Sequence, residues 1–316
     1  MNTILSHSRD VIQDSISVSV SLLKILIPAI LIVRLLDLMG VAELLASALG
    51  APLALLGLPA IAGFIWATTI LTNIYGGMIV LFTFQQSWTI EQITILGILM
   101  LGAHNLIVEL AVAYKARCRI LPMIILRLGG ALGLAAIMHS IYQQIPAMQE
   151  LIKWSWVPET IDTSWGGWAT AQLEMLFWTQ VIIFVLVAFL KVCKLTGIER
   201  LIEKLLKPFL KLIGIKENAL SMNLIGMTLG LAYGGGLLIR EAEKGILTAR
   251  DIFSSFCLLG LCHSLIEDTL LIALTGAELH GILWARLAFA LIIIAVITRL
   301  LPRIPDRIFY TFFVRR

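Results

Sequence analysis

The chain has 316 residues, of which 59% are hydrophobic and only 14% are charged, and its mean hydropathy is +0.95. Soluble domains carry about 25% charged residues, so this chain has too few polar side chains to build an aqueous surface and belongs in a lipid bilayer. The composition excludes a cytosolic enzyme, a nucleic-acid-binding protein and a secreted disulfide scaffold. The net charge of +4 is small, and its distribution along the chain is more informative than its sum.

Six apolar runs are long enough to cross a bilayer, because a transmembrane helix needs roughly 20 mostly apolar residues. They lie at about Ser19–Gly40, Ile93–Ala113, Leu121–His139, Leu176–Val192, Ile252–Leu274 and Ile282–Leu301. Two shorter segments, Val41–Leu56 and Leu195–Ile215, have helical periodicity, and the second is strongly amphipathic. This pattern predicts helices that lie at the membrane surface.

Two further apolar runs are interrupted by polar and glycine residues. Leu58–Phe84 is interrupted at Thr72–Gly77, and Ala219–Ile239 is interrupted at Tyr233–Gly236. Two helices of about ten residues reach only about 15 Å each, the middle of a ~30 Å hydrocarbon core. We therefore expect re-entrant helical hairpins with tips at Asn73–Gly77 and at Tyr233–Gly236. The alternative is ordinary spans in which glycine permits close helix packing.

The order of these elements repeats along the chain. His104–Glu109 (HNLIVE) resembles His263–Asp268 (HSLIED), and Arg127–Leu132 (RLGGAL) resembles Arg286–Leu291 (RLAFAL). Both pairs are separated by 159 residues (263 − 104 and 286 − 127), so the match needs no gap. Landmarks that recur in the same order predict two structurally related halves.

Basic residues indicate that the two halves have opposite orientations, because short cytoplasmic loops are enriched in Lys and Arg. The first half has a basic loop at Lys115–Arg119, whereas the matching loop around Thr275–Glu278 has no basic residue. The second half instead has basic residues at Lys191–Lys216, at Arg240–Arg250 and after Arg299. The sequence thus predicts an all-α polytopic membrane protein with an inverted-topology repeat. Each half is expected to contain three transmembrane helices, one re-entrant helical hairpin and one interfacial helix.

This arrangement divides the chain into five segments. They are an N-terminal cytoplasmic segment (1–16), a first repeat (17–142), an extracytoplasmic linker (143–173), a second, inverted repeat (174–302) and a basic cytoplasmic tail (303–316). We expect a multi-pass protein of the bacterial inner membrane with both termini in the cytoplasm.

The hairpin tips form the first candidate site, because non-helical backbone at membrane depth is tolerated only where it is buried in protein or lines a polar cavity. Broken helices expose amide and carbonyl groups that bind polar groups and ions. The candidate substrate-binding residues at the tips are Thr72, Asn73, Tyr75, Gly76, Gly77, Tyr233, Gly234 and Gly235. The alternative is that the glycines only pack helices against one another.

Polar residues inside two of the predicted spans form the second candidate site. They are His104, Asn105, His263 and Ser264 for substrate binding, and Glu109, Glu267 and Asp268 for ion coupling. Ionisable residues at membrane depth cost about 2.5–3.5 kcal/mol each on insertion scales, so a functional role is the default expectation. Helical spacing predicts shared faces for Asn105 with Glu109, for Ser264 with Asp268, and for His263 with Glu267. The alternative is a structural polar cluster that joins the halves.

Two arginines and a cysteine complete the set of candidates. Arg127 and Arg286 each lie near the start of a span, where they either reach the headgroups or form an internal ion pair with a carboxylate. Cys262, His263 and Glu267 offer an alternative transition-metal site, since thiol, imidazole and carboxylate groups are metal ligands. The sequence contains no nucleophile elbow, metalloprotease motif or phosphate-binding loop, so an enzyme is not expected.

The Asn-x-x-Gly pattern of Asn73–Gly76, together with the matched stretches His104–Glu109 and His263–Asp268, resembles the nucleoside-recognition or Gate-domain membrane proteins. That family includes the spore-maturation proteins and the membrane domain of the bacterial ferrous-iron transporter, and it is distantly similar to concentrative nucleoside transporters. The resemblance covers nearly the whole chain as two Gate units and implies roles for Asn73 and Gly76 at the first tip. At the second tip Leu231 takes the place of the asparagine.

These observations predict a secondary active transporter that moves a small polar solute, nucleoside-like or anionic, by alternating access coupled to H⁺ or Na⁺. A divalent metal-ion permease and a non-transporting membrane scaffold are the alternatives. No cofactor is expected beyond H⁺ or Na⁺ as coupling ion. The expected partners are the substrate and membrane lipid, with a homo-oligomer as a further option and no nucleic acid.

Overall fold

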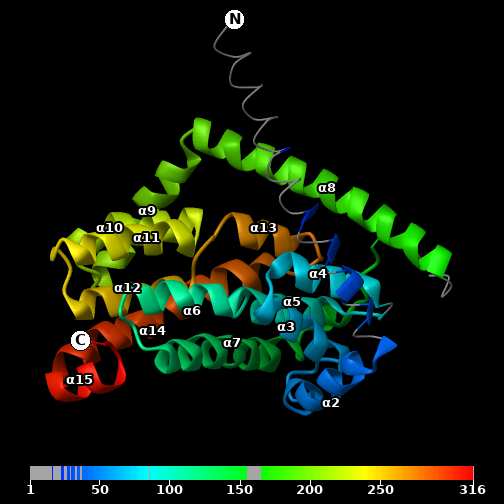
Figure 1. Ribbon diagram of the computed structural model, residues 1–316, viewed down its shortest axis with the longest axis horizontal. Helices are drawn as coiled ribbons and strands as arrows, with labels where there is room; N and C mark the ends of the chain where they lie inside the picture. The colour runs from blue at the N-terminus through cyan, green and yellow to red at the C-terminus, as the bar shows by residue number, and fades with distance from the viewer. Residues whose placement is uncertain are drawn as a thin grey trace, which may run out of the picture.

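The computed structural model of the chain is built of helices (Figure 1). It describes residues 38–84, 86–154 and 165–315, together with some positions between 16 and 35. Nearly all of the predicted N-terminal segment, about half of the predicted span at Ser19–Gly40 and the middle of the predicted linker lie outside the described residues.

Three described helical stretches are long and apolar enough to cross a membrane: Ile90–Lys115, Ile120–Tyr142 and His280–Arg303. They coincide with three of the predicted spans. A fourth predicted span, Leu176–Val192, lies within the 31-residue helix α8 (Trp165–Leu195), which runs along the outside of the molecule in Figure 1.

The first interrupted run forms a helical hairpin of two short apolar helices, α3 (Ile61–Leu71) and α4 (Ile74–Thr83). The two helices pack closely, because a Cβ atom at Gly77 would collide with the Thr69 hydroxyl. Asn73 ends the break by capping α4, since its Oδ1 accepts a hydrogen bond from the Gly76 amide at 2.9 Å. The break is therefore at residues 72–73, and both glycines of the predicted tip belong to α4.

The second interrupted run also forms a hairpin, but its tip is not where the sequence predicted it. Helices α10 (Glu217–Leu229) and α11 (Leu231–Glu243) are separated by Gly230, whose φ of 97° is accessible mainly to glycine. Tyr233–Gly236 lies within α11. A Cβ atom at Gly234 would collide with the Gly226 backbone in α10, so this glycine permits helix packing, which was the alternative interpretation.

Two predicted spans are interrupted at their polar residues. The stretch Ile93–Ala113 is divided into α5 (Ile90–Gly102) and α6 (Leu106–Lys115). In the other half, Ile252–Leu274 is divided into α12 (Ala249–Leu261) and α13 (Glu267–Ala273). The prediction of one continuous helix is therefore wrong for both stretches.

The two breaks have matching backbone conformations. Asn105 and Ser264 are left-handed, with φ of 48° and 47°, and they lie 159 residues apart. The helices before the breaks begin alike as well, with capping boxes at Thr89/Gln92 and at Thr248/Asp251. Equivalent positions in the two segments thus adopt equivalent local structure.

Long helices flank the broken ones. α7 (Ile120–Tyr142) and α14 (Arg286–Leu300) lie beside α5/α6 and α12/α13 (Figure 1). A six-residue π-helical segment, η2 (His280–Ala285), leads into α14. The remaining elements are α2 (Val41–Ala54), α9 (Ile198–Leu212), α15 (Asp306–Phe312) and two short 3₁₀ segments, η1 (Pro146–Gln149) and η3 (Leu301–Arg303).

Two buried apolar clusters hold the molecule together, and each includes residues from both halves of the chain. The cluster built mainly from α3 to α7 also contains Leu271, Ile272 and Ile282. The cluster built mainly from α9 to α15 also contains Ala113 and Met123. Because apolar burial dominates packing energy, this exchange fixes the broken helices of the two halves against one another.

Candidate functional site

Both hairpin tips and both helix breaks line one cavity of about 240 Å³. Its polar lining residues are Asn73, Tyr75, His104, Asn105, Glu109, His263, Ser264 and Asp268. Gly230 and Leu231 contribute the second tip. Residues far apart in the sequence are thus brought to a single cavity.

Several predicted site residues do not line this cavity. Thr72 donates its hydroxyl to the Thr68 carbonyl of α3 at 2.6 Å, and Gly76 and Gly77 pack α4 against threonines of the first hairpin. Gly234 packs against α10 and Gly235 packs beside α6 and α12, and the Tyr233 side chain is outside the described residues. Glu267 begins α13 and is not among the residues that line the cavity.

Arg127 and Arg286 satisfy the carbonyl groups that the two breaks leave without helical partners. Arg127 Nε donates to Gly102 O at 3.2 Å, and its Nη2 donates to His104 O at 3.1 Å. Arg286 Nε donates to Leu261 O at 3.2 Å. Its Nη2 donates to His263 O at 3.0 Å. Both side chains are only 3% exposed, so the interpretation that they reach the headgroups is wrong.

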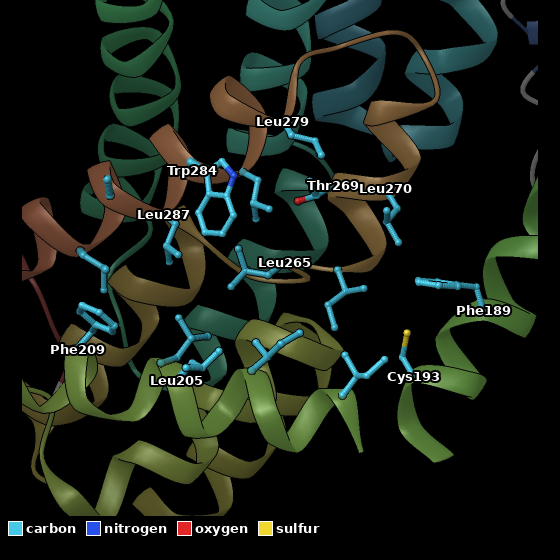
Figure 2. Close-up of a pocket in the computed structure, with 17 residues that line it drawn as sticks. Phe189, Cys193, Leu205, Phe209, Leu265, Thr269, Leu270, Leu279, Trp284 and Leu287 are labelled. Atoms are coloured by element: carbon cyan, nitrogen blue, oxygen red, sulfur yellow. The ribbon is translucent and has the colours of Figure 1, made fainter. Parts of the chain in front are cut away.

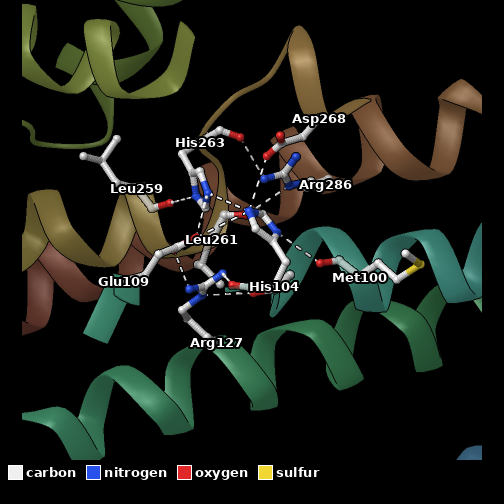
Figure 3. Close-up of polar contacts among 10 residues, drawn as sticks. Met100, His104, Glu109, Arg127, Leu259, Leu261, His263, Asp268 and Arg286 are labelled. Atoms are coloured by element: carbon white, nitrogen blue, oxygen red, sulfur yellow. Dashed lines mark hydrogen bonds and ion pairs between the residues drawn. The ribbon is translucent and has the colours of Figure 1, made fainter. Parts of the chain in front are cut away.

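The carboxylates beside these arginines differ in their hydrogen-bond partners. Glu109 Oε2 accepts a hydrogen bond from Arg127 Nη1 at 2.5 Å, as an internal ion pair. Asp268 occupies the equivalent position near Arg286 (Figure 3), but its side chain is one methylene shorter. Among the described residues, neither Asp268 Oδ2 nor Arg286 Nη1 has a hydrogen-bond partner.

Two histidines meet between the halves. His104 Nδ1 lies 3.1 Å from Met100 O, and His263 Nδ1 lies 2.6 Å from Leu259 O. A carbonyl oxygen only accepts hydrogen bonds, so both Nδ1 atoms carry hydrogen and each neutral ring presents a lone pair at Nε2. The two Nε2 atoms are 3.1 Å apart. Two facing lone pairs at this distance repel unless a proton or a cation lies between them.

Two carboxylates face these nitrogens, Glu109 both of them and Asp268 that of His104. Glu109 Oε1 lies 3.4 Å from His104 Nε2 and 3.3 Å from His263 Nε2. Asp268 Oδ2 lies 3.4 Å from His104 Nε2 (Figure 3). The described part of the chain thus gathers His104, His263 and Asp268 as a group with metal-ligand spacing. Of the alternative metal residues, only His263 belongs to this group, and Cys262 and Glu267 do not.

A larger cavity of about 680 Å³ lies between α8, α9, α13 and the segment that leads into α14 (Figure 2). Its lining is apolar and includes Phe189, Leu205, Leu265, Trp284 and Leu287. No Asp, Glu, Lys, Arg or His is among the described residues that line it. Such a groove suits hydrocarbon rather than an ion or a polar solute.

The apolar helices, buried ionisable residues and broken spans define a helical membrane protein. The chain is a distant homologue of YvoD from Bacillus subtilis (strain 168), which is described as an uncharacterized membrane protein. The two are 26% identical over 276 residues, which cover 85% of this chain and 87% of YvoD. No family model matches the chain, and no solved structure matches it. Membership in the Gate-domain family therefore stays a prediction.

Proposed function

We propose that the protein is a transporter that moves a small polar or ionic solute across the bacterial cytoplasmic membrane by alternating access. The observation that carries the proposal is the convergence of both hairpin tips and both helix breaks on one cavity that contains two histidines and two carboxylates. Ionisable groups at membrane depth are costly, at about 2.5–3.5 kcal/mol each. Their concentration at one cavity is typical of a substrate or ion pathway.

The proposal includes an inverted-topology repeat. Its support is that contacts recur at a spacing of 159 residues: Arg127 with the carbonyls of 102 and 104, and Arg286 with those of 261 and 263. The opposite loop charges of the two halves support the inversion. In such proteins the substrate binds where the repeats meet, at discontinuous helices. The Gate-domain resemblance agrees with this arrangement.

The size of the cavity favours a small solute. A volume of about 240 Å³ is below the roughly 300–1,000 Å³ typical of drug-sized ligand sites. A small ion therefore fits better than a nucleoside.

Uptake into proteoliposomes tests the proposal. The purified protein should accumulate at least one member of a panel of inorganic ions and small polar solutes under a proton or sodium gradient. Asp268→Asn and His104→Gln should abolish that uptake. His139→Gln is the matched control, because His139 pairs with Glu91 at 2.7 Å and does not line the cavity.

Two results would contradict transport. One is the absence of uptake for every member of the panel in protein that is folded and monodisperse. The other is unchanged uptake in both cavity variants. A membrane scaffold, by contrast, predicts that Asn73→Leu at the first tip leaves the cellular phenotype intact.

A further inference from the structure

We propose that the cavity binds a divalent transition-metal ion through His104 Nε2, His263 Nε2, Glu109 Oε1 and Asp268 Oδ2. This assignment names the solute class for the cavity. Its transport role rests on the proposed function, whereas metal binding itself does not. Each half of the chain contributes one imidazole and one carboxylate.

The ligand atoms lie close enough together for one ion, since those of His104, His263 and Asp268 are all within 4.8 Å of one another and Glu109 Oε1 lies near both histidine nitrogens. With metal–ligand distances of about 2.0–2.1 Å, neighbouring ligand atoms in a tetrahedral site lie roughly 3.3 Å apart. The two Nε2 atoms are separated by 3.1 Å. The oxygen of Glu109 lies 3.3 and 3.4 Å from the two nitrogens, and that of Asp268 lies 3.4 Å from His104 Nε2. A cation at the centre converts the repulsion between facing lone pairs into coordination.

The surrounding groups hold the ligands in the orientation that a metal needs. A metal-bound histidine almost always donates its other ring N–H to a carbonyl or carboxylate, which fixes its tautomer. His104 and His263 have Met100 O and Leu259 O in that position. Arg127 binds Oε2 of Glu109 and leaves Oε1 toward the nitrogens. Asp268 Oδ2, without a hydrogen-bond partner among the described residues, is the fourth ligand.

The charge of the site and the type of its ligands limit which ions it can bind. Imidazole suits zinc, iron, copper and nickel, and added carboxylates suit manganese and iron, so first-row divalent ions fit better than Na⁺ or Ca²⁺. The formal charges of Glu109, Asp268, Arg127 and Arg286 sum to zero. A bound divalent ion therefore adds two positive charges that the site does not neutralise, which favours exchange over permanent retention. Separation of the halves would divide the ligand set and release the ion.

The test is titration of the full-length protein in detergent with Zn²⁺ by isothermal calorimetry, with Mn²⁺ as a second probe. We expect one ion per chain. Asp268→Asn should weaken binding about tenfold or more. The His104→Gln/His263→Gln double variant should abolish it. Asp268→Asn removes no hydrogen bond seen in the structure, so it should fold even where the double variant does not. Cys262→Ser and His139→Gln are controls that should bind as the parent does.

Three results would overturn the metal assignment. They are no binding of either ion to the parent protein, parent-like affinity in Asp268→Asn, and loss of binding in Cys262→Ser alone. If uptake of another solute still depended on Asp268, the transport proposal would stand without the metal. If Zn²⁺ bound as expected but nothing were transported, the metal site would stand and the transport proposal would fall.

Discussion

The two helix breaks are built alike, yet their carboxylates have different environments. In each break an arginine binds two freed carbonyls, a left-handed residue redirects the chain, and a histidine donates Nδ1–H to the carbonyl four residues before it. Glu109 reaches its arginine, whereas Asp268, one methylene shorter, does not. The same scaffold therefore holds one carboxylate in place and leaves the other available for a ligand.

The largest expected effect is the difference in stability between variants of the two arginines. Arg127→Met leaves Glu109 buried without its partner, and breaking a buried ion pair from one side costs about 3–5 kcal/mol. Arg286→Met removes the equivalent carbonyl bonds but no ion pair. Unfolding in detergent with increasing SDS should therefore show a much larger loss of stability for Arg127→Met. Equal losses would show that the two breaks do not differ as we describe.

Exchanging the two carboxylate side chains tests whether the length of the side chain decides which of them binds an arginine. Glu109→Asp should lose the bond to Arg127, and a hydrogen bond to a charged group contributes about 1.5–3 kcal/mol. Asp268→Glu should reach Arg286 Nη1, which has no hydrogen-bond partner in the described part of the chain, and raise stability by about 1 kcal/mol. Destabilisation by Asp268→Glu would contradict this interpretation of side-chain length.

The sequence was sufficient to predict apolar spans, two hairpins and equivalent residues 159 positions apart. It did not reveal the helix breaks, because Asn105 and Glu109, four residues apart, also fit one polar face of a continuous helix. The left-handed residues at the breaks are Asn105 and Ser264. Asparagine tolerates that conformation better than most residues, which was a weak local signal. Apart from Glu109, the hydrogen-bond partners of the two arginines are backbone carbonyls, which every residue carries and which the sequence therefore does not reveal.

Two alanine substitutions in the second hairpin measure how much its stability depends on the glycine at the tip. Gly230 has φ of 97°, and a Cβ atom there would lie 2.8 Å from the Ser264 hydroxyl. Gly230→Ala should therefore cost about 1–3 kcal/mol through backbone strain. Gly236→Ala is the matched control, because a Cβ atom there meets nothing within 4 Å. It should be neutral or slightly stabilising, since alanine favours helix by up to about 1 kcal/mol over glycine.

Asn73→Ala extends this comparison to the first tip. It removes the side-chain cap of α4, and such a cap typically contributes about 1 kcal/mol. The loss at the first tip should thus be no larger than the loss at Gly230. Thermal unfolding of the three variants in one detergent gives the order. A larger loss for Asn73→Ala would mean that the first tip depends on contacts beyond this cap.

Single cysteine substitutions at two exposed lysines, which should change the structure least, test whether the two halves are inverted. Lys115 and Lys244 are exposed at the ends of α6 and α11. In an inverted repeat with basic loops in the cytoplasm both face the same side. Single cysteines at these positions should react with a membrane-impermeant maleimide in inside-out vesicles and not in intact cells.

The native cysteines should contribute little background to that experiment. All four are buried, and burial raises the pKa of the Cys118 thiol, in the loop beside Lys115, to about 12. At pH 7 this thiol is therefore almost wholly protonated, and only the thiolate is reactive. Stability should change by less than about 0.5 kcal/mol in both variants, as for other exposed positions. Labelling of Lys115→Cys and Lys244→Cys from opposite sides would rule out the inverted arrangement, while the local equivalence of the two breaks would remain.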